Sequence, residues 1–242
     1  MIHQTNIPTL SKADSLRESP LFGQLSDAQR EAIAGDMIER RYAPGDVIFY
    51  EGDPGQALYL LASGQVRIFV HGAEGSETSV IVFGRSGEMF GELAVVDGLP
   101  RSATAVAMGQ TTLYLLSRDN FRTHMQQCPQ FALNFMQELT LRVRYNTRQM
   151  DSLASLTVPQ RLARKLIELA HNYGRATEDG VLIDMALSQT DLANLIGATR
   201  ESANKSLRDF RRQHWISLRD GRFLIHDADA LRAQGGGLTV NS

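Results

Sequence analysis

One segment of the chain, FGELAVVDGLPRSATA at 90–105, carries residue types that can bind an anionic ligand bearing hydroxyl groups. Gly91 opens a short predicted helix, whose first N–H groups are free to hold an anion. Arg101 can add two charge-assisted hydrogen bonds to a phosphate, and Glu92 can accept from a ribose hydroxyl. The same residues also fit a purely structural loop in which Arg101 pairs with Glu92 or Asp97.

A second segment, LSQTDLANLIGATRESANKSLRDFRRQ at 187–213, has the pattern of a DNA-reading element. Ser188 is expected to cap a short helix that runs through Ile196, and Gly197 supplies the turn. A second, basic helix is expected to begin near Thr199. Two helices joined by a tight turn at glycine predict a helix-turn-helix.

The side chains of the second helix suit base edges and phosphates. Arginine and lysine donate to guanine, and glutamate accepts from cytosine. Glu201 and Lys205 lie four residues apart and therefore share a face. Their spacing also fits a simple surface ion pair. The predicted base-reading residues are Arg200, Glu201, Ser202, Asn204 and Lys205, and the predicted phosphate contacts are Arg208, Arg211 and Arg212.

A hairpin follows the basic helix, at 215–226. Asp220-Gly221 is a preferred two-residue hairpin turn, and it joins two strand-like runs. Arg219 and Arg222 flank this turn. We predict that the hairpin is a wing beside the DNA and that Arg222 contacts it.

The distribution of charge agrees with a nucleic-acid contact near the C-terminus. Residues 1–157 carry 13 Lys/Arg and 17 Asp/Glu, net −4, and residues 158–242 carry 12 and 10, net +2. Within 198–222 there are seven basic residues against three acidic ones. A local basic cluster in an otherwise acidic chain is typical of a DNA-contacting surface, although charge alone fits a solvated helix face equally well.

The elements that must position the first segment are β-strands. Short runs rich in Val, Ile, Leu, Phe and Tyr recur between about 37 and 117, separated by turn sequences such as PGD and EGDPG. Many short strands at near-regular spacing predict a sandwich or barrel, with a jelly roll as the natural candidate. The predicted strands are 46–50, 57–63, 65–70, 78–83, 102–108 and 111–116. A capped helix, with Ser26 and Gln29 as a capping box and Gly35 at its end, precedes them.

A long helix is expected after Pro129, because neither Gly nor Pro interrupts the chain until Pro159. Its apolar positions are spaced alternately four and three residues apart, which is a heptad seam. A rod of about 40 Å is too long to be covered by one small barrel alone. A helix that lies along its own domain is the alternative, but the regular seam favours a parallel homodimer, which we predict. The seam residues are Ala132, Met136, Leu139, Val143, Met150 and Leu153, with Asn146 in the one gap.

The cassette at 90–105 resembles the phosphate-binding cassette of the cyclic-nucleotide-binding domain. The chain as a whole is similar, from about residue 19 to 232, to the cyclic-AMP receptor protein branch of the CRP/FNR transcription regulator superfamily. The resemblance is carried by SPLFGQLS at 19–26, YAPGDVIFYEGDPGQALYLLASGQVRIF at 42–69 and ATRESANKSL at 198–207.

The resemblance implies the ligand and its contacts. Ribose and cyclic phosphate would be held by Gly91, Glu92, Leu93, Arg101 and Ser102, and Asn146 and Thr147 fall where the family contacts adenine. Asn-Thr at 146–147 departs from the Thr-Ser of the family's best-known member. The implied effector is cAMP, with cGMP as a second nucleotide that could bind. The implied partners are double-stranded DNA with half-sites close to TGTGA and TCACA, a second copy of the chain, and RNA polymerase.

The sequence therefore predicts an α+β protein: a cyclic-nucleotide-binding jelly-roll domain with an N-terminal helix at 1–128, a dimerisation helix at 129–157, a winged helix-turn-helix at 158–234 and a flexible tail at 235–242. It predicts no enzyme and no metal site, because Cys128 is the single cysteine and the histidines are isolated. The lack of an export signal or membrane span predicts a cytoplasmic protein. A superfamily member that senses another ligand, or none, is the alternative. A metal-dependent jelly-roll enzyme and a kinase or channel regulatory subunit fit the residues less well.

Overall fold

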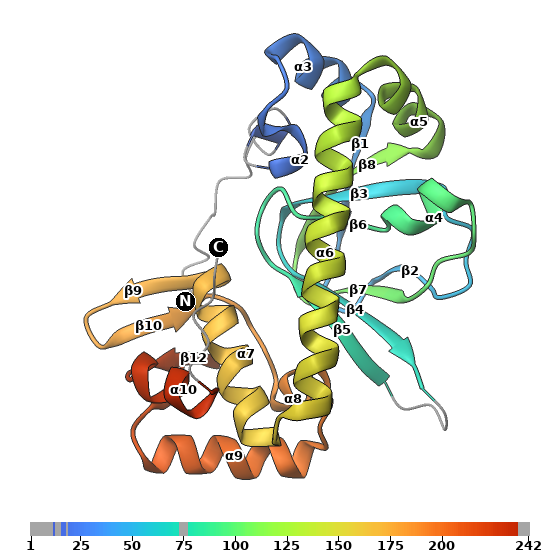
Figure 1. Ribbon diagram of the computed structural model, residues 1–242. Coiled ribbons are helices and arrows are strands. Elements are labelled where there is room, and N and C mark those ends of the chain that lie inside the picture. Colours follow the sequence, from blue (N-terminus) through green and yellow to red (C-terminus); the bar gives the residue numbers. More distant parts are fainter. Residues whose placement is uncertain (1–11, 13–15, 18, 73–76, 237–242) are drawn as a thin grey trace. The chain divides into compact units, whose positions relative to one another are not determined.

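The computed structural model describes residues 12, 16–17, 19–72 and 77–236 (Figure 1). It contains a β-rich domain, a long helix and a C-terminal winged helix-turn-helix, as predicted. By its contacts the chain divides into two compact units, Met1–Arg67 with Val82–Leu141 and Ile68–Ile81 with Arg142–Ser242. Among the described residues, no helix has both the length and the apolar character needed to cross a membrane.

Two four-stranded sheets make up the β-rich domain, in the orders β1-β8-β3-β6 and β2-β7-β4-β5. In the first sheet β8 is central, and it pairs antiparallel with both β1 and β3. Apolar side chains alternate or run continuously along the central strands, which is the pattern of a buried sandwich. The strands are β1 (Met37–Tyr42), β2 (Val47–Phe49), β3 (Ala57–Ser63), β4 (Val66–His71), β5 (Glu77–Phe83), β6 (Met89–Phe90), β7 (Thr104–Ala107) and β8 (Thr111–Ser117).

The six predicted strands are all present, but the sequence analysis missed β1 and β6. In β1 only Met37 is buried, so its sequence lacks the apolar run or alternation that marks a strand. β6 has two residues, too few to form a pattern. Pairing with β8 and β3, rather than local sequence, therefore defines these two strands.

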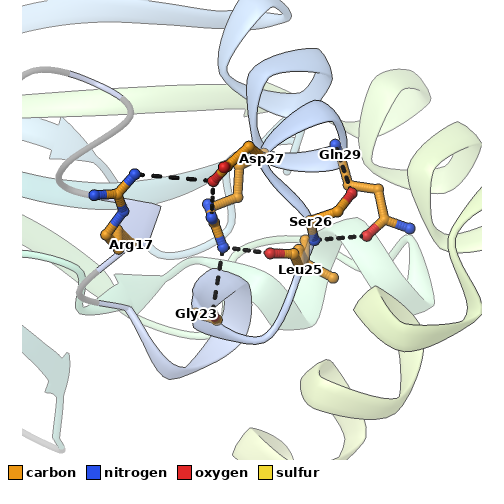
Figure 2. A network of polar contacts seen from close by, with 7 residues as sticks. Arg17, Gly23, Leu25, Ser26, Asp27 and Gln29 are labelled. Atoms are coloured by element: carbon orange, nitrogen blue, oxygen red, sulfur yellow. Dashed lines mark hydrogen bonds and ion pairs between the residues drawn. The ribbon is translucent and has the colours of Figure 1, made fainter.

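Helices α2 (Pro20–Gly23) and α3 (Asp27–Gly35) precede the sheets, and the predicted capping box of Ser26 and Gln29 is confirmed. Arg30 donates to the carbonyls of Gly23 and Leu25 and pairs with Asp27. Figure 2 shows the surroundings of these contacts, with Arg17 directed at Asp27 and Ser26 beside Gln29. These contacts fix the turn between the two helices. Leu21, Phe22 and Ile33 can then enter the core beneath the first sheet.

A helix pair follows β8: α5 (Arg118–Gln127) and the long α6 (Pro129–Ser155). The sequence analysis did not predict α5 as a separate helix. The ring of Phe121 in α5 packs edge to face against two rings of α6, with centroid distances of 5.9 Å to Phe131 and 5.1 Å to Phe135. The helix α6 ends at Ser155, two residues before the predicted boundary, and Thr157 caps the next helix.

The C-terminal domain is built from α7 (Val158–Tyr173), α8 (Gln189–Leu195), α9 (Arg200–Arg212) and α10 (Ala228–Gln234), with a four-stranded sheet. Its strands, in the order β11-β12-β10-β9, are β9 (Gly174–Thr177), β10 (Gly180–Ile183), β11 (Ile216–Arg219) and β12 (Arg222–Ile225). The sequence analysis missed β9, whose residues are mostly exposed. The predicted flexible tail falls mainly on 237–242, outside the described residues.

Candidate functional site

The guanidinium of Arg101 is buried in the β-rich domain, where the residue keeps 4% of its surface exposed. Its Nη1 donates to the carbonyl of Gly91 at 2.6 Å, and its Nη2 donates to the carbonyl of Ala57 at 2.8 Å. Within the described part of the chain, its Nε has no hydrogen-bond partner. The guanidinium is thus held by backbone acceptors, and not by the side-chain ion pair with Glu92 or Asp97 that the sequence left open.

An aromatic wall lies beside this guanidinium. The Arg101 carbon Cζ is 4.3 Å from the ring centroid of Phe49 and 5.4 Å from that of Tyr59. Tyr59 in turn stacks on Phe90 at 5.2 Å. Ring faces attract a cation, so the wall compensates part of the cost of burying the charge. Burial lowers the pKa of Arg101, but an arginine stays protonated at neutral pH.

Sequence reasoning missed Ala57, Phe49 and Tyr59 as members of this site. Phe49 and Tyr59 lie in predicted strands, and their aromatic rings are ordinary core residues by pattern alone. The contact through Ala57 uses a backbone carbonyl, which no residue type encodes. These members could be found only from the pairing of strands.

Gly91 is required by two features of its position. It caps α4 (Glu92–Asp97) with a left-handed backbone conformation, at φ 74°. Residues other than glycine adopt this conformation only with strain. A Cβ atom at this position would lie 2.7 Å from Nη1 of Arg101 and 3.2 Å from the ring of Tyr59. The backbone of the cassette therefore approaches Arg101 as closely as it can.

The remaining predicted cassette residues differ in exposure. Glu92 is 7% exposed, on the first turn of α4. Burial lowers the pKa of Arg101, and the nearby carboxylate of Glu92 offsets part of this lowering. Leu93 is 50% exposed, and Ser102 is exposed at the surface. The fold thus brings Gly91, Glu92 and Arg101 together at a buried cation, and leaves Leu93 and Ser102 facing outward.

Asn146 and Thr147 lie on the second half of α6, and both are exposed. The hydroxyl of Thr147 donates to the carbonyl of Val143 at 3.0 Å, one turn earlier in the same helix. These two residues belong to the unit that includes Arg142–Ser242. Their role as base contacts stays a prediction.

Both helices of the helix-turn-helix are capped, the first by Ser188 as predicted. Ser188 forms a capping box with Asp191 at the start of α8, and Thr199 accepts from the N–H of Ser202 at the start of α9. Gly197 in the turn has φ 58°. One face of α9 is buried, and its buried residues are Ala203, Ser206, Leu207 and Phe210.

The opposite face of α9 is exposed to solvent. Figure 1 shows α9 as the helix that follows α8. Glu201 and Lys205 are both exposed on this face, and their reading of base edges stays a prediction. Asn204 and Arg211 are half-buried, and their shielded polar atoms lack hydrogen-bond partners among the described residues. The exposed predicted contacts are Arg200, Glu201, Ser202, Lys205, Arg208 and Arg212.

The predicted wing is the hairpin β11–β12, with Asp220 at φ 51° and Gly221 at φ 75° in its turn. Both of its arginines are engaged by carboxylates. Arg219 pairs with Asp179, and Nη1 of Arg222 lies 2.6 Å from Oδ1 of Asp184. A phosphate would therefore have to compete with Asp184 for Arg222.

A β-rich domain with a candidate anion-binding cassette, followed by a long helix and a winged helix-turn-helix, is the architecture of ligand-responsive DNA-binding regulators. Residues 39–128 match the cyclic nucleotide-binding domain family, and residues 160–234 match the Crp-like helix-turn-helix domain family. Among the described residues, no group of three or more His, Cys, Asp or Glu side chains could hold a metal ion.

Two curated relatives cover almost the whole chain. The CRP-like cAMP-activated global transcriptional regulator of Mycobacterium tuberculosis is 33% identical over 216 residues, 89% of this chain and 96% of that protein. The cyclic AMP receptor protein of Thermus thermophilus is 31% identical over 223 residues, 92% of this chain and 100% of that protein. The chain belongs to the CRP/FNR superfamily of transcription regulators.

A solved structure agrees with this assignment. The catabolite activator protein of Thermus thermophilus matches with a TM-score of 0.53 and 32% identity, over 91% of this chain and 100% of that one. The enzyme and kinase-subunit alternatives are thereby set aside in favour of a transcription regulator.

The geometry at Gly91 predicts that Gly91→Ala destabilises the β-rich domain. A left-handed alanine costs about 1–2 kcal/mol, and the added Cβ must also displace Arg101. Gly109→Ala is the matched control, because a Cβ there has no neighbour within 4 Å. Denaturant unfolding of both variants measures the difference. Equal stability of Gly91→Ala and wild type would contradict the described cassette.

Proposed function

We propose that the protein is a homodimeric, cAMP-responsive transcription regulator that binds near-palindromic DNA with TGTGA-like half-sites. The observation that carries the proposal is the buried guanidinium of Arg101, held against the N-terminus of α4 by the carbonyls of Gly91 and Ala57. This is a preformed site for a single phosphate charge. The names of the two relatives, each covered along almost its full length, point to cAMP as the nucleotide.

The chemistry of the cassette suits a cyclic phosphate. A phosphodiester carries one negative charge, which the guanidinium neutralises without a metal ion. The unsatisfied Nε–H of Arg101 and the free N–H groups at the start of α4 are donors still available to phosphate oxygens. Glu92 is an acceptor for the ribose hydroxyl. The aromatic wall of Phe49 and Tyr59 excludes water from the pair and strengthens it.

The seam of α6 supports the dimer. Met136, Val143 and Met150 are 55%, 65% and 71% exposed in the single chain, at heptad spacing along one helix. Large apolar side chains repeated in one stripe are stabilised by a facing helix. A second copy of the chain is the partner that a two-fold seam requires. Two copies of α9 would then read two half-sites about one helical turn apart.

The exposed face of α9 supports specific DNA reading. Arg200 and Lys205 can donate to guanine, and Glu201 can accept from cytosine. Arg208 and Arg212 lie further along the same helix, where they can contact phosphates. A regulator of this kind would act in the cytoplasm together with RNA polymerase.

A second effector is favoured by one residue. The amide of Asn146 can both donate and accept a hydrogen bond, so it can pair with guanine as well as adenine. We therefore propose that cGMP binds without switching the protein, because guanine presents O6 where adenine presents an amino group. Sensing of a different ligand, or none, is the alternative outcome of the binding tests below.

Arg101→Ala is predicted to abolish tight cAMP binding. A buried charge left without its partner costs about 3–5 kcal/mol, which is more than about a hundredfold in affinity. Isothermal titration calorimetry on the folded variant measures the loss, and circular dichroism checks the fold. Arg122→Ala, which removes an exposed arginine of α5, is the control and should bind normally. Unchanged affinity in a folded Arg101→Ala protein would refute the cassette assignment.

Two substitutions on α9 are predicted to act differently on DNA. Glu201→Ala should relax the preference at one base pair by about 1–3 kcal/mol, because it removes a base-edge acceptor. Arg208→Ala should weaken all sequences alike and lower the salt slope by about one, because it removes a phosphate contact. Selection from random DNA and salt titrations separate the two effects. An asymmetric or unrelated selected motif would sink the proposed DNA target.

Asn146→Leu is predicted to remove the response to cAMP. If Asn146 only fixes the register of the seam, the leucine tightens the dimer and leaves the cAMP response intact. If it contacts the base, the stimulation of DNA binding by cAMP falls. The measurement is DNA affinity of both proteins with cAMP, cGMP or neither. Equal stimulation by cAMP in both proteins would leave Asn146 as a register residue only.

A further inference from the structure

A part-buried polar cluster joins the second half of α6 to α7, with the buried Lys165 at its centre. The hydroxyl of Tyr145 donates to Oε1 of Glu168 at 2.9 Å and accepts from Nζ of Lys165 at 2.8 Å. Lys165 also donates to both carboxylate oxygens of Glu168 at 2.9 Å. Gln149 donates to the same carboxylate at 3.3 Å. Lys165 is 5% exposed, so this ammonium depends on its two partners instead of water.

The protonation of the cluster is fixed by its surroundings. Burial raises the pKa of Tyr145, and the nearby carboxylate of Glu168 raises it further. The phenol therefore keeps its proton at neutral pH and acts as a donor to Glu168. Tyr145, Lys165 and Glu168 each form hydrogen bonds to the other two residues of the cluster.

A second set of contacts ties the end of α6 to the helix-turn-helix. Arg161 of α7 donates through Nη1 to the carbonyl of Leu156 at 2.7 Å, just past the end of α6. Through Nε and Nη2 it donates to the carbonyls of Ile196 and Gly197, at 2.7 and 3.2 Å, in the turn before α9. The side chain of Leu153 also lies against Gly197, 2.7 Å from where a Cβ would be.

We propose that Tyr145, Lys165 and Glu168 are positioning residues that make the last turns of α6 and the winged helix one rigid body. The inference rests on the proposed function in one respect, which is that Asn146 and Thr147 contact the bound base. Under it, the residues that sense the base and the helix that reads DNA move together. The short connection at 156–157 is then not a flexible link between sensor and reader.

The consequence concerns how ligand energy reaches the DNA. A ligand shifts a two-state equilibrium only by its difference in affinity for the two states. If Asn146 were free to move relative to α9, base contacts would stabilise α6 without orienting the reader. The cluster begins at Tyr145, directly beside Asn146, and so it removes that freedom at the point where the base would bind.

The first experiment tests the rigid body without ligand. Hydrogen exchange of the full-length protein is compared for wild type, Tyr145→Phe and Lys165→Met. Each substitution removes polar bonds of the cluster but keeps most of the side-chain volume. We expect amides of 145–155 to exchange at least about tenfold faster, as the loss of one buried hydrogen bond allows. Ser155→Ala is the matched control, because its hydroxyl bonds only to Asp151 within α6.

The second experiment measures coupling between ligand and DNA. The stimulation factor is the ratio of the DNA dissociation constants without and with cAMP, which is about 5–150 for typical allosteric coupling. We expect Tyr145→Phe and Lys165→Met to lower it at least about threefold, while DNA affinity without ligand stays within about twofold. By linkage, the effect of DNA on cAMP affinity must fall by the same factor. A merely structural defect would instead weaken DNA binding with and without cAMP alike.

The outcomes separate the inference from the proposed function. Unchanged exchange at 145–155 in both variants overturns the rigid body. Faster exchange with a full stimulation factor overturns the role of the rigid body in coupling ligand to DNA. Faster exchange together with a reduced factor supports it. A wild-type protein that does not respond to cAMP refutes the proposed effector. In that case the exchange measurement alone still decides whether the cluster holds the two elements together.

Discussion

The burial of the Arg101 guanidinium constrains most of the structure around the candidate ligand site. A cation removed from water must be hydrogen-bonded, and here its acceptors are carbonyls from two separate segments, at Gly91 and Ala57. The left-handed Gly91 allows the first approach, and the antiparallel pairing of β3 and β6 brings Ala57 near the cassette. The aromatic rings of Phe49 and Tyr59 then close the remaining side. Strand pairing, the turn at Gly91 and two core aromatic rings therefore all contribute to the surroundings of the Arg101 guanidinium.

The same cation explains why the site suits a phosphate. Backbone carbonyls accept from Nη1 and Nη2 of Arg101, and Nε has no partner among the described residues. An anion is a stronger acceptor than a carbonyl, so under the proposed function a bound phosphate would pair with a cation that the fold has already buried. Arg101 loses its water when the protein folds, so no further desolvation of this side chain would oppose the binding of a phosphate.

The long helix α6 has two kinds of surface, and they serve different purposes. Its apolar stripe is exposed at Met136, Val143 and Met150. Its second half also carries the part-buried polar cluster around Tyr145, which lies against α7. Hydrogen bonds between shielded polar groups depend strongly on geometry, so they fix an orientation more sharply than apolar packing alone. Under the proposed function, α6 would contact a second copy through one face and the DNA-binding domain through another.

The sequence by itself determined the class of fold, the order of the domains and the family. The β-runs, the capped helices, the Gly turn at 197 and the cassette pattern are local features, and local propensity and periodicity report them directly. It also singled out Gly91, Glu92 and Arg101 as candidate ligand contacts, and the fold places these three residues close together. It missed β1, β6 and β9, which are exposed or very short and exist because a neighbouring strand pairs with them.

Only the tertiary structure decided which groups complete the site and which cationic side chains are free. The carbonyl of Ala57 and the ring of Phe49 reach Arg101 through strand pairing and packing between segments about fifty residues apart in the chain. Asp184 engages Arg222, and Glu168 engages Lys165 and Tyr145, through contacts that no local pattern encodes. Residue type fixes what a side chain can do, but its partners depend on distances in space that the chain acquires only when it folds.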